Sequence, residues 1–364
     1  MNDPKISVLI PMYNRKHYIQ DCIDSALNQT FQDFEIIVRD DGSKDGSAEF
    51  VEKIYAKEIS EGKIKLFRND ENMGEYRTVI RLLNFDGTGK YFHILHSDDV
   101  FLPYALQHLY EVAEKTNADV VHSIGHFNTP EDGIVNPDML KPQIHEAHPV
   151  KQIEIMPSDP KFRFAEWAIN GTFCDAQYNL FSKNFIRENE LLFNPCGYGL
   201  NFFLLFWMMK AKIFVKTPVL YYVRVESPDS LTNKKRNLAN QVKGYVSGML
   251  EFSRMIDNLL PRIKFFRDNP DLQRFAKFKF MTDFEHYGVT RFGIYKDGGS
   301  PEIWEAVESA FSKYVGDENA FYPALLFSWM QTARFGKDFN QIMLQRALKS
   351  LESPPPSMQQ PHNS

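Results

Sequence analysis

Cysteine is scarce in this sequence, and long apolar runs are missing from it. The three cysteines among 364 residues, Cys22, Cys174 and Cys196, lie far apart and form no Cys-x-x-Cys pair, so neither a zinc site nor a disulfide framework is expected. The longest apolar run, 202–209, is far shorter than the roughly 20 residues that a membrane-spanning helix needs. We therefore expect reduced thiols and a cytoplasmic protein.

Basic residues are not in excess either. The formal net charge is −5, which disfavours nucleic acid as a partner. No Gly-x-Gly-x-x-Gly follows the first predicted strand, which disfavours a dinucleotide-binding Rossmann domain. The first five residues lack the basic and then apolar pattern of a signal peptide, which again favours the cytoplasm. What remains, 43% hydrophobic and 24% charged residues, is typical of a globular protein.

The first 125 residues alternate short apolar strand patterns with amphipathic helix patterns. Such alternation predicts an α/β fold, in which a mainly parallel sheet is sandwiched by helices. Asn14 is the expected N-cap of the first helix. The predicted strands are 6–10, 34–38, 63–67, 91–95 and 119–122, and the predicted helices are 15–28, 47–58, 75–84 and 102–115.

The pattern changes several times beyond residue 125. Frequent proline predicts a loop-rich insertion at 126–160. Strand signals fade after about residue 235, where helices are predicted at 241–259, 271–287, 301–314 and 339–351. The last twelve residues contain three consecutive prolines and predict a disordered tail. The expected divisions are 1–125, 126–235, 236–352 and 353–364.

Polar loops follow three of the predicted strands, at 11–14, 40–43 and 96–99. In a parallel sheet such loops open onto one edge, where ligands bind. The adjacent acids Asp98 and Asp99 repel one another unless a cation lies close, and their hard oxygen ligands suit Mg²⁺ or Mn²⁺. Simpler interpretations stay open: the acids of the third loop as helix caps, and the second loop as an Asp-Gly turn.

Taken together, these motifs resemble the inverting glycosyltransferases of family 2, which have the GT-A fold. Order and spacing match over residues 6–125, and the combination is far more specific than any single piece. The matching segments are Ile6-Ser7-Val8-Leu9-Ile10-Pro11-Met12-Tyr13-Asn14, Ser25-Ala26-Leu27-Asn28-Gln29-Thr30, Asp40-Asp41-Gly42-Ser43, Asn72-Met73-Gly74, Gly89-Lys90-Tyr91-Phe92 and Ser97-Asp98-Asp99.

The resemblance implies a donor site shared between the loops. The first loop would line the pocket for base and ribose, one acid of the second would bind the base, usually uracil, and the acids of the third would hold Mn²⁺ or Mg²⁺ against the donor diphosphate. The residues implied for the nucleotide are Pro11, Tyr13, Asn14, Asp40, Asp41, Arg81, His96 and Ser97, and those for the metal are Asp98 and Asp99.

Three features depart from the family pattern. The Ala-Arg-Asn that often follows the Asn-x-Gly landmark is absent, and Arg77 or Arg81 could serve the diphosphate instead. His96 stands where the metal motif usually begins with Asp, which weakens the metal prediction. Leu200-Asn201 stands where the family has the Glu-Asp pair that supplies its base, and an Asn cannot accept the proton of a sugar hydroxyl. An acceptor phosphate would need no base. The alternative base is Asp175, with Glu166, Glu226 and Asp229 as weaker candidates.

Basic and aromatic side chains interleave over residues 262–280. Such a segment suits peripheral contact with an anionic membrane surface, near a lipid-linked acceptor. A pair of helices with Phe inward and Lys or Arg outward explains the same pattern and is the favoured interpretation.

The leading hypothesis is a metal-dependent inverting glycosyltransferase of hexosyltransferase type. It would move a sugar from a nucleotide diphosphate, expected to be UDP, to a saccharide or polyprenyl-linked acceptor of a bacterial capsule, lipopolysaccharide or related glycan. The expected location is the cytoplasm, including the inner face of the cell membrane. Two alternatives stay open: a degenerate GT-A binding module, which Leu200-Asn201 favours, and a nucleotidyltransferase, which the missing Gly-rich basic loop disfavours.

Overall fold

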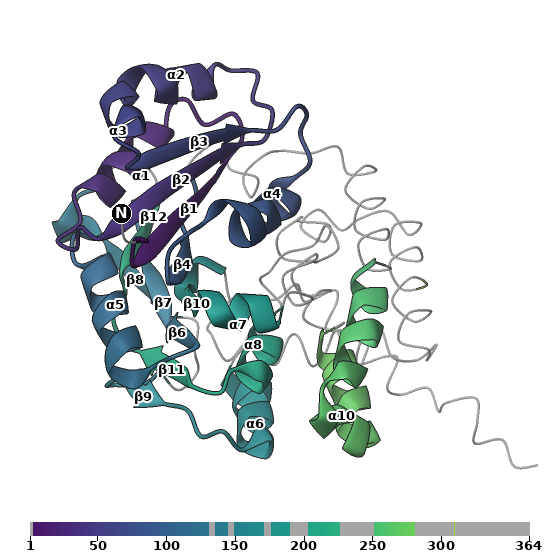
Figure 1. Cartoon of the computed structure of the whole chain (residues 1–364). Helices are drawn as coiled ribbons and strands as arrows, with labels where there is room; N and C mark the ends of the chain where they lie inside the picture. The colour runs from purple at the N-terminus through teal and green to yellow at the C-terminus, as the bar shows by residue number, and fades with distance from the viewer. Residues whose placement is uncertain are drawn as a thin grey trace, which may run out of the picture. The chain divides into compact units, whose positions relative to one another are not determined.

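The computed structural model describes residues 3–130, 135–144, 149–170, 176–189, 203–225 and 251–280, together with residue 309. The chain divides into two compact units, residues 1–230 and 231–364. Both β-sheets belong to the first unit (Figure 1).

The first unit is built around a large mixed sheet of eight strands. These strands are β1 (Ile6–Met12), β2 (Phe34–Asp40), β3 (Ile64–Arg68), β4 (Tyr91–Ile94), β6 (Val120–Ser123), β9 (Glu154–Ile155), β10 (Asn179–Ser182) and β11 (Phe214–Thr217). Their order across the sheet is β3-β2-β1-β4-β10-β6-β11-β9. Strands β3, β2, β1 and β4 are parallel, whereas β10 runs antiparallel to both of its neighbours.

The first unit also contains a second, smaller sheet of four strands, with the order β5-β12-β7-β8. Its strands are β5 (Val100–Phe101), β7 (Gly125–Asn128), β8 (Lys141–Ile144) and β12 (Tyr222–Arg224). The segment predicted as a loop-rich insertion therefore supplies a β-hairpin, and also β9 at the edge of the large sheet. Only glycine fits at position 125, because a Cβ there would lie 2.0 Å from the Gln143 carbonyl oxygen.

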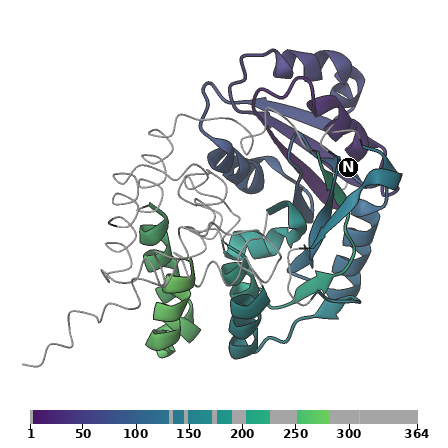
Figure 2. The same ribbon diagram turned by 180° about the vertical axis from the view of Figure 1, so that it is seen from behind.

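Helices flank the large sheet on both sides, so the predicted α/β architecture is confirmed. The helices of the first unit are α1 (Ile19–Leu27), α2 (Ser47–Ile54), α3 (Ala56–Ser60), α4 (Glu75–Arg81), α5 (Ala105–Thr116), α6 (Pro160–Asn170), α7 (Lys183–Glu188) and α8 (Leu204–Lys210), with short helical turns η1 (Leu82–Asp86), η2 (Pro137–Met139) and η3 (Ala176–Tyr178). Helix α5 lies on one side and α4 on the other, in the front view and from behind (Figure 2). Every residue of β1 and β2 is buried, as expected of parallel strands covered on both faces.

The first helix begins later than predicted, and the prediction of Asn14 as its N-cap is wrong. Helix α1 starts at Ile19 after Tyr18, which makes no side-chain cap. Asn14 instead has a φ of 53° and accepts a hydrogen bond from the amide of Lys44 with its own side chain. The intervening residues form a turn in which the Arg15 carbonyl accepts from the amides of Tyr18 and Ile19. Tertiary contacts of the loop have overridden a local capping signal.

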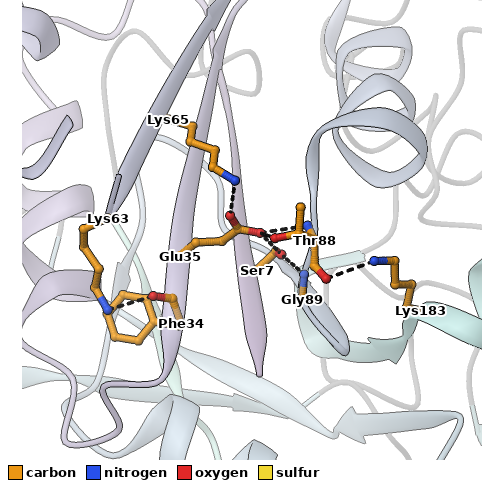
Figure 3. A network of polar contacts seen from close by, with 8 residues as sticks. All are labelled: Ser7, Phe34, Glu35, Lys63, Lys65, Thr88, Gly89 and Lys183. Carbon is orange, nitrogen blue, oxygen red and sulfur yellow. Dashed lines mark hydrogen bonds and ion pairs between the residues drawn. The ribbon is translucent and has the colours of Figure 1, made fainter. Parts of the chain in front are cut away.

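The amino-terminal end of the sheet holds a buried carboxylate whose hydrogen bonds are all made within the protein (Figure 3). Glu35 accepts from the Ser7 hydroxyl (2.6 Å), from the amide and hydroxyl of Thr88 (both 2.8 Å) and from the Lys65 ammonium (2.7 Å). The amide of Gly89 donates to Ser7, and a Cβ at this position would lie 2.6 Å from the Ser7 amide nitrogen. Glycine is therefore required for this close approach.

The second unit is helical over its described residues, 251–280. They comprise a helical segment at 251–259, η6 (Leu260–Arg262), α10 (Lys264–Asp268) and a helical segment at 270–280. Phe252, Phe266 and Phe280 are fully buried, whereas Arg262 and Arg274 are exposed. Lys279, however, is buried and Phe275 is 42% exposed, so the favoured interpretation, with Phe inward and Lys or Arg outward, holds only in part. Among the described residues, no helix is both long enough and apolar enough to cross a membrane.

Candidate functional site

The carboxyl ends of β1, β2 and β4 lie next to one another, and one polar loop follows each of them. Met12 is paired with Asp40 in the strand register, and the Asp41 amide donates to the Met12 carbonyl (2.8 Å). The amide of Leu95, at the end of β4, donates to the Leu9 carbonyl of β1 (3.0 Å). The three predicted loops therefore leave the sheet at the same edge.

Hydrogen bonds fasten the first loop to the second. The Asn14 amide donates to the Ser43 hydroxyl, and the Lys44 amide donates to Asn14 Oδ1, both at 2.8 Å. Gly42 is needed in the second loop because its φ is +73° and a Cβ would lie 2.9 Å from the carbonyl carbon of Glu71. Pro11 is buried in β1, whereas the Tyr13 side chain is 41% exposed at the edge. An exposed aromatic ring on a rigid loop suits the stacking of a flat ligand.

The adjacent acids of the second loop have different surroundings. Asp41 Oδ1 accepts from the Asn69 amide nitrogen (2.8 Å) and from the Met73 backbone (2.9 Å), and its Oδ2 accepts from the Gly74 backbone (2.9 Å). Asp40 Oδ2 accepts from the Ser43 amide (3.1 Å), whereas its Oδ1 is buried without a hydrogen-bond partner among the described residues. Asp41 thus holds the loop at 72–74, and Asp40 keeps an open acceptor.

Arg81 lies on the Asp41 side of the site. Its guanidinium donates to Asn69 Oδ1 (3.3 Å), and the amide nitrogen of Asn69 donates to Asp41. A second guanidinium, that of Arg39, donates to the same Asn69 oxygen (2.9 Å) and makes two bonds of 2.7 Å to Asp86. This network of hydrogen bonds holds Asp41 and Asn69 in place. The sequence offers no signal for it, because its members come from four separate elements.

The two acids of the third loop also differ. Asp98 is paired with Arg15, with 3.3 Å between Nη2 and Oδ2. Asp99 is buried, and its two oxygens accept from the Gln177 side chain (2.8 Å) and from the Val225 amide (3.0 Å). Burial, with the neighbouring charge of Asp98, raises the pKa of Asp99 to about 7. Asp98 is therefore the acid of this pair that lies open to a ligand.

His96 and Ser97 complete the third loop. His96 Nε2 lies 3.5 Å from Glu75 Oε1, and its backbone amide donates to Gln177 Oε1 (3.3 Å). Ser97 is 5% exposed. The structure therefore brings together all ten residues predicted for nucleotide and metal, at the edge formed by these loops. It adds Arg15, Glu75 and Gln177, of which only Arg15, directly after the first loop, has a position in the sequence that could have indicated it.

The catalytic base predictions cannot be placed, because Asp175, Glu226, Asp229 and the pair Leu200-Asn201 lie outside the described residues. Glu166 is described, and its Oε1 lies 2.7 Å from the Lys216 ammonium. Within the described ranges, no group of three or more His, Cys, Asp or Glu side chains is arranged to hold a metal ion.

Comparison with known proteins identifies the family. The family model described as "Glycosyl transferase family 2" matches residues 7–188, which is half of the chain. The chain belongs to glycosyl transferase family 2. The resemblance inferred from the strand and loop motifs is thereby confirmed.

Two relatives are each similar to about a third of the chain. "Glycosyltransferase GlyG" of Streptococcus pneumoniae is 33% identical over 122 residues, covering 34% of this chain and 38% of that protein. "Uncharacterized glycosyltransferase EpsJ" of Bacillus subtilis is 35% identical over 118 residues, covering 32% and 33%. The chain therefore spans only about a third of the length of these relatives.

Solved structures extend the similarity in fold. TarS residues 1–349 of S. aureus has a TM-score of 0.59 at 16% identity, and the match covers 92% of this chain and 93% of that one. At this identity the likeness concerns the fold alone, and it agrees with the GT-A architecture predicted for this chain.

Proposed function

We propose that the protein transfers a sugar from a UDP-sugar to a hydroxyl or phosphate acceptor, with inversion at the anomeric carbon. The observation that carries the donor part is Asp40 Oδ1, a buried carboxylate oxygen left without a partner among the described residues. A buried acceptor of this kind costs stability unless a ligand supplies a donor. The ring N–H of uracil is such a donor, and the Tyr13 ring lies on the adjoining loop.

A similar fold supports UDP as the nucleotide. Structures of TarS residues 1–349 are titled as complexes with UDP-GlcNAc and with UDP. In this chain Pro11, Tyr13 and Asn14 would bound the base and ribose, and His96 and Ser97 would face the sugar-phosphate. Arg81, which reaches Asn69 from α4, would supply positive charge to the diphosphate.

The acid pair offers a divalent cation one accessible carboxylate rather than two. Asp98 alone offers an accessible oxygen, because both oxygens of Asp99 already accept hydrogen bonds from the protein. One carboxylate suits Mg²⁺ or Mn²⁺ that keeps several waters and shares the donor phosphates, rather than a cage built by the protein. A cation held there would neutralise charge on the departing diphosphate. Asp99 would keep Asp98 in position through Gln177 and Val225.

The acceptor side rests on the sequence. We propose Asp175 as the base for a hydroxyl acceptor, and no base for a polyprenyl phosphate, which is already ionised. The family resemblance supports acceptors of bacterial surface glycans, and the named relatives above are bacterial proteins. We further propose that the enzyme works in the cytoplasm, at or near the inner face of the membrane.

Calorimetric titration of UDP, with and without Mn²⁺, tests the donor site. We expect binding that Mn²⁺ strengthens, and a loss of at least about tenfold in affinity for Asp40→Asn, since one buried charged hydrogen bond is removed. Asp70→Asn, an exposed carboxylate just after β3, is the matched control and should bind UDP like the wild type. Equal affinities for both variants would refute the role of Asp40.

Turnover separates an enzyme from a binding module. We expect the purified protein to hydrolyse or transfer from a UDP-sugar, and Asp98→Asn to abolish this turnover while UDP binding persists in weakened form. UDP binding without turnover of any tested UDP-sugar would favour the degenerate module that Leu200-Asn201 suggests.

A further inference from the structure

Arg15 joins the two loops that bound the donor site. It follows Asn14 in the first loop, and its guanidinium pairs with Asp98 of the third loop at 3.3 Å. Both side chains are largely shielded from water, with 14% and 18% exposed. In the described part of the chain no second cation is paired with Asp98. The ion pair therefore involves Oδ2 of Asp98, the more accessible acid of the pair.

The backbone of Arg15 is held at both ends, which leaves the side chain as the movable part. Its amide donates to the Ser47 hydroxyl (2.9 Å), and its carbonyl accepts from the amides of Tyr18 and Ile19 (both 2.9 Å). Beyond Asp98, the one further polar contact of the guanidinium with a described residue is a long hydrogen bond to the Asn14 carbonyl (3.4 Å). A rotation of the side chain would cost this weak bond and the ion pair, with no change in the loop.

The guanidinium and a divalent cation compete for the same carboxylate. Two cations a few ångströms apart repel strongly in a partly buried site. Asp99 is less suited than Asp98 as a ligand, since it is buried and each of its oxygens already accepts a hydrogen bond, from Gln177 or from Val225. A diphosphate, in contrast, is a good partner for a guanidinium, which binds phosphate oxygens in a bidentate manner.

The geometry points to Arg15 as a positioning residue that exchanges partners when the donor binds. Without donor it neutralises Asp98 and holds the third loop against the first. With donor, Asp98 is released to the cation and Arg15 pairs with the donor diphosphate. This inference rests on the proposed function. Binding of the cation and binding of the nucleotide are therefore coupled. The cation releases Arg15 for the diphosphate, and the diphosphate releases Asp98 for the cation.

Mn²⁺ and UDP binding to the full chain, measured separately and together by calorimetry, tests the exchange. Arg15→Gln should bind Mn²⁺ alone about tenfold more tightly, because the competing charge is gone, and should bind UDP in saturating Mn²⁺ about tenfold more weakly. Arg15→Lys keeps the charge and should retain the direction of the wild-type coupling. Lys16→Gln removes the same charge one residue further on and is the matched control. Circular dichroism of each variant checks that the fold is kept.

The outcomes separate the two proposals. If the wild type binds UDP and Arg15→Gln behaves like Lys16→Gln in both titrations, the partner exchange is overturned and the donor site stands. Tighter Mn²⁺ with weaker UDP in Arg15→Gln alone supports the exchange. If the wild type binds no UDP with or without Mn²⁺, the proposed function fails, and the exchange fails with it.

Discussion

The acids at the two ends of the large sheet differ in how many hydrogen-bond partners the protein gives them. At the amino-terminal end, Glu35 receives hydrogen bonds from Ser7, Lys65 and Thr88. At the carboxyl-terminal end, Asp40 keeps a buried oxygen without a partner among the described residues, and Asp98 and Asp99 stand side by side. The first arrangement satisfies its acid within the protein, and the second is the one for which we have proposed a ligand.

The pKa shifts of the two ends show the same contrast. Burial alone would raise the pKa of Glu35, but the hydrogen bonds from Lys65, Ser7 and Thr88 outweigh it and lower the pKa. Burial and the charge of Asp98 raise the pKa of Asp99. The hydrogen bonds to Glu35 thus outweigh its burial, whereas the two hydrogen bonds to Asp99 do not outweigh its burial and the neighbouring charge of Asp98. The comparison teaches that burial by itself does not distinguish a structural acid from one held for function.

The largest expected effect on stability comes from neither end of the sheet but from two buried histidines, His93 in β4 and His122 in β6. Burial lowers the pKa values of His93 and His122 to about 3 from 6.5. Above pH 6.5 both states are neutral, whereas below it the unfolded chain takes up protons that the native state refuses. Each histidine should therefore lower stability by about 2 kcal/mol between pH 7 and pH 5. Asp99 acts in the opposite direction, because its raised pKa of about 7 lets the native state take up a proton first, and it should return about 2 kcal/mol over the same range.

Urea unfolding at pH 7, 6 and 5 measures this loss, with His93→Leu as the variant. His93 lies edge-on to Phe101 and Tyr221, so an apolar side chain suits the site. Between pH 7 and pH 5 the change in the stability of the variant should differ from that of the wild type by about 2 kcal/mol, in the direction of a smaller loss. The same loss in the variant as in the wild type would show that His93 is not responsible. Since the pKa of Glu35 lies below 4.5, its contribution should be lost only at lower pH, which separates the amino-terminal network from the histidines.

The next effect tests the closed end of the sheet. Glu35→Gln removes the charge that Lys65 pairs with and puts an amide among donors, so we expect a loss of about 2 to 3 kcal/mol in the free energy of unfolding. UDP affinity should be unchanged, because Glu35 lies at the other end of the strands from the donor loops. Glu52→Gln, which breaks the exposed pair with Arg68, is the control and should leave stability unaltered. Weaker UDP binding in Glu35→Gln would show that the two ends are coupled.

At the carboxyl-terminal end of the sheet we expect the reverse: a substitution that changes UDP affinity more than stability. Asp40→Asn replaces a buried carboxylate that lacks a partner for one oxygen, so stability should change by no more than about 1 kcal/mol, in either direction. The same variant should lose UDP affinity, as proposed above. A loss of stability as large as that of Glu35→Gln would mean that Asp40 is a structural acid, and the contrast between the two ends would disappear.

Sequence patterns predicted the order of strands and helices well, because the spacing of apolar residues and the residues that form turns are local features of the sequence. They also predicted which loops meet at one edge, since parallel strands impose this. They could not distinguish Asp40 from Asp41, which are adjacent and chemically identical. Only the folded chain brings Asn69 and the loop at 72–74 onto Asp41 and leaves Asp40 open. Gln177 was missed for the same reason, since 78 residues separate it from Asp99.

The smallest expected effect concerns Asn14, where local strain and tertiary contacts balance. Its φ of 53° costs a residue with a side chain about 1 kcal/mol, and the hydrogen bond from the Lys44 amide returns a similar amount. Asn14→Gly loses both terms, so stability should stay nearly constant, whereas Asn14→Ala keeps the strain, loses the bond and should be about 1 kcal/mol less stable. Both variants should bind UDP more weakly by a few-fold, because the first loop is no longer tied to the second. If Asn14→Gly kept full UDP affinity, the backbone bond to Ser43 alone would suffice to order the donor loop.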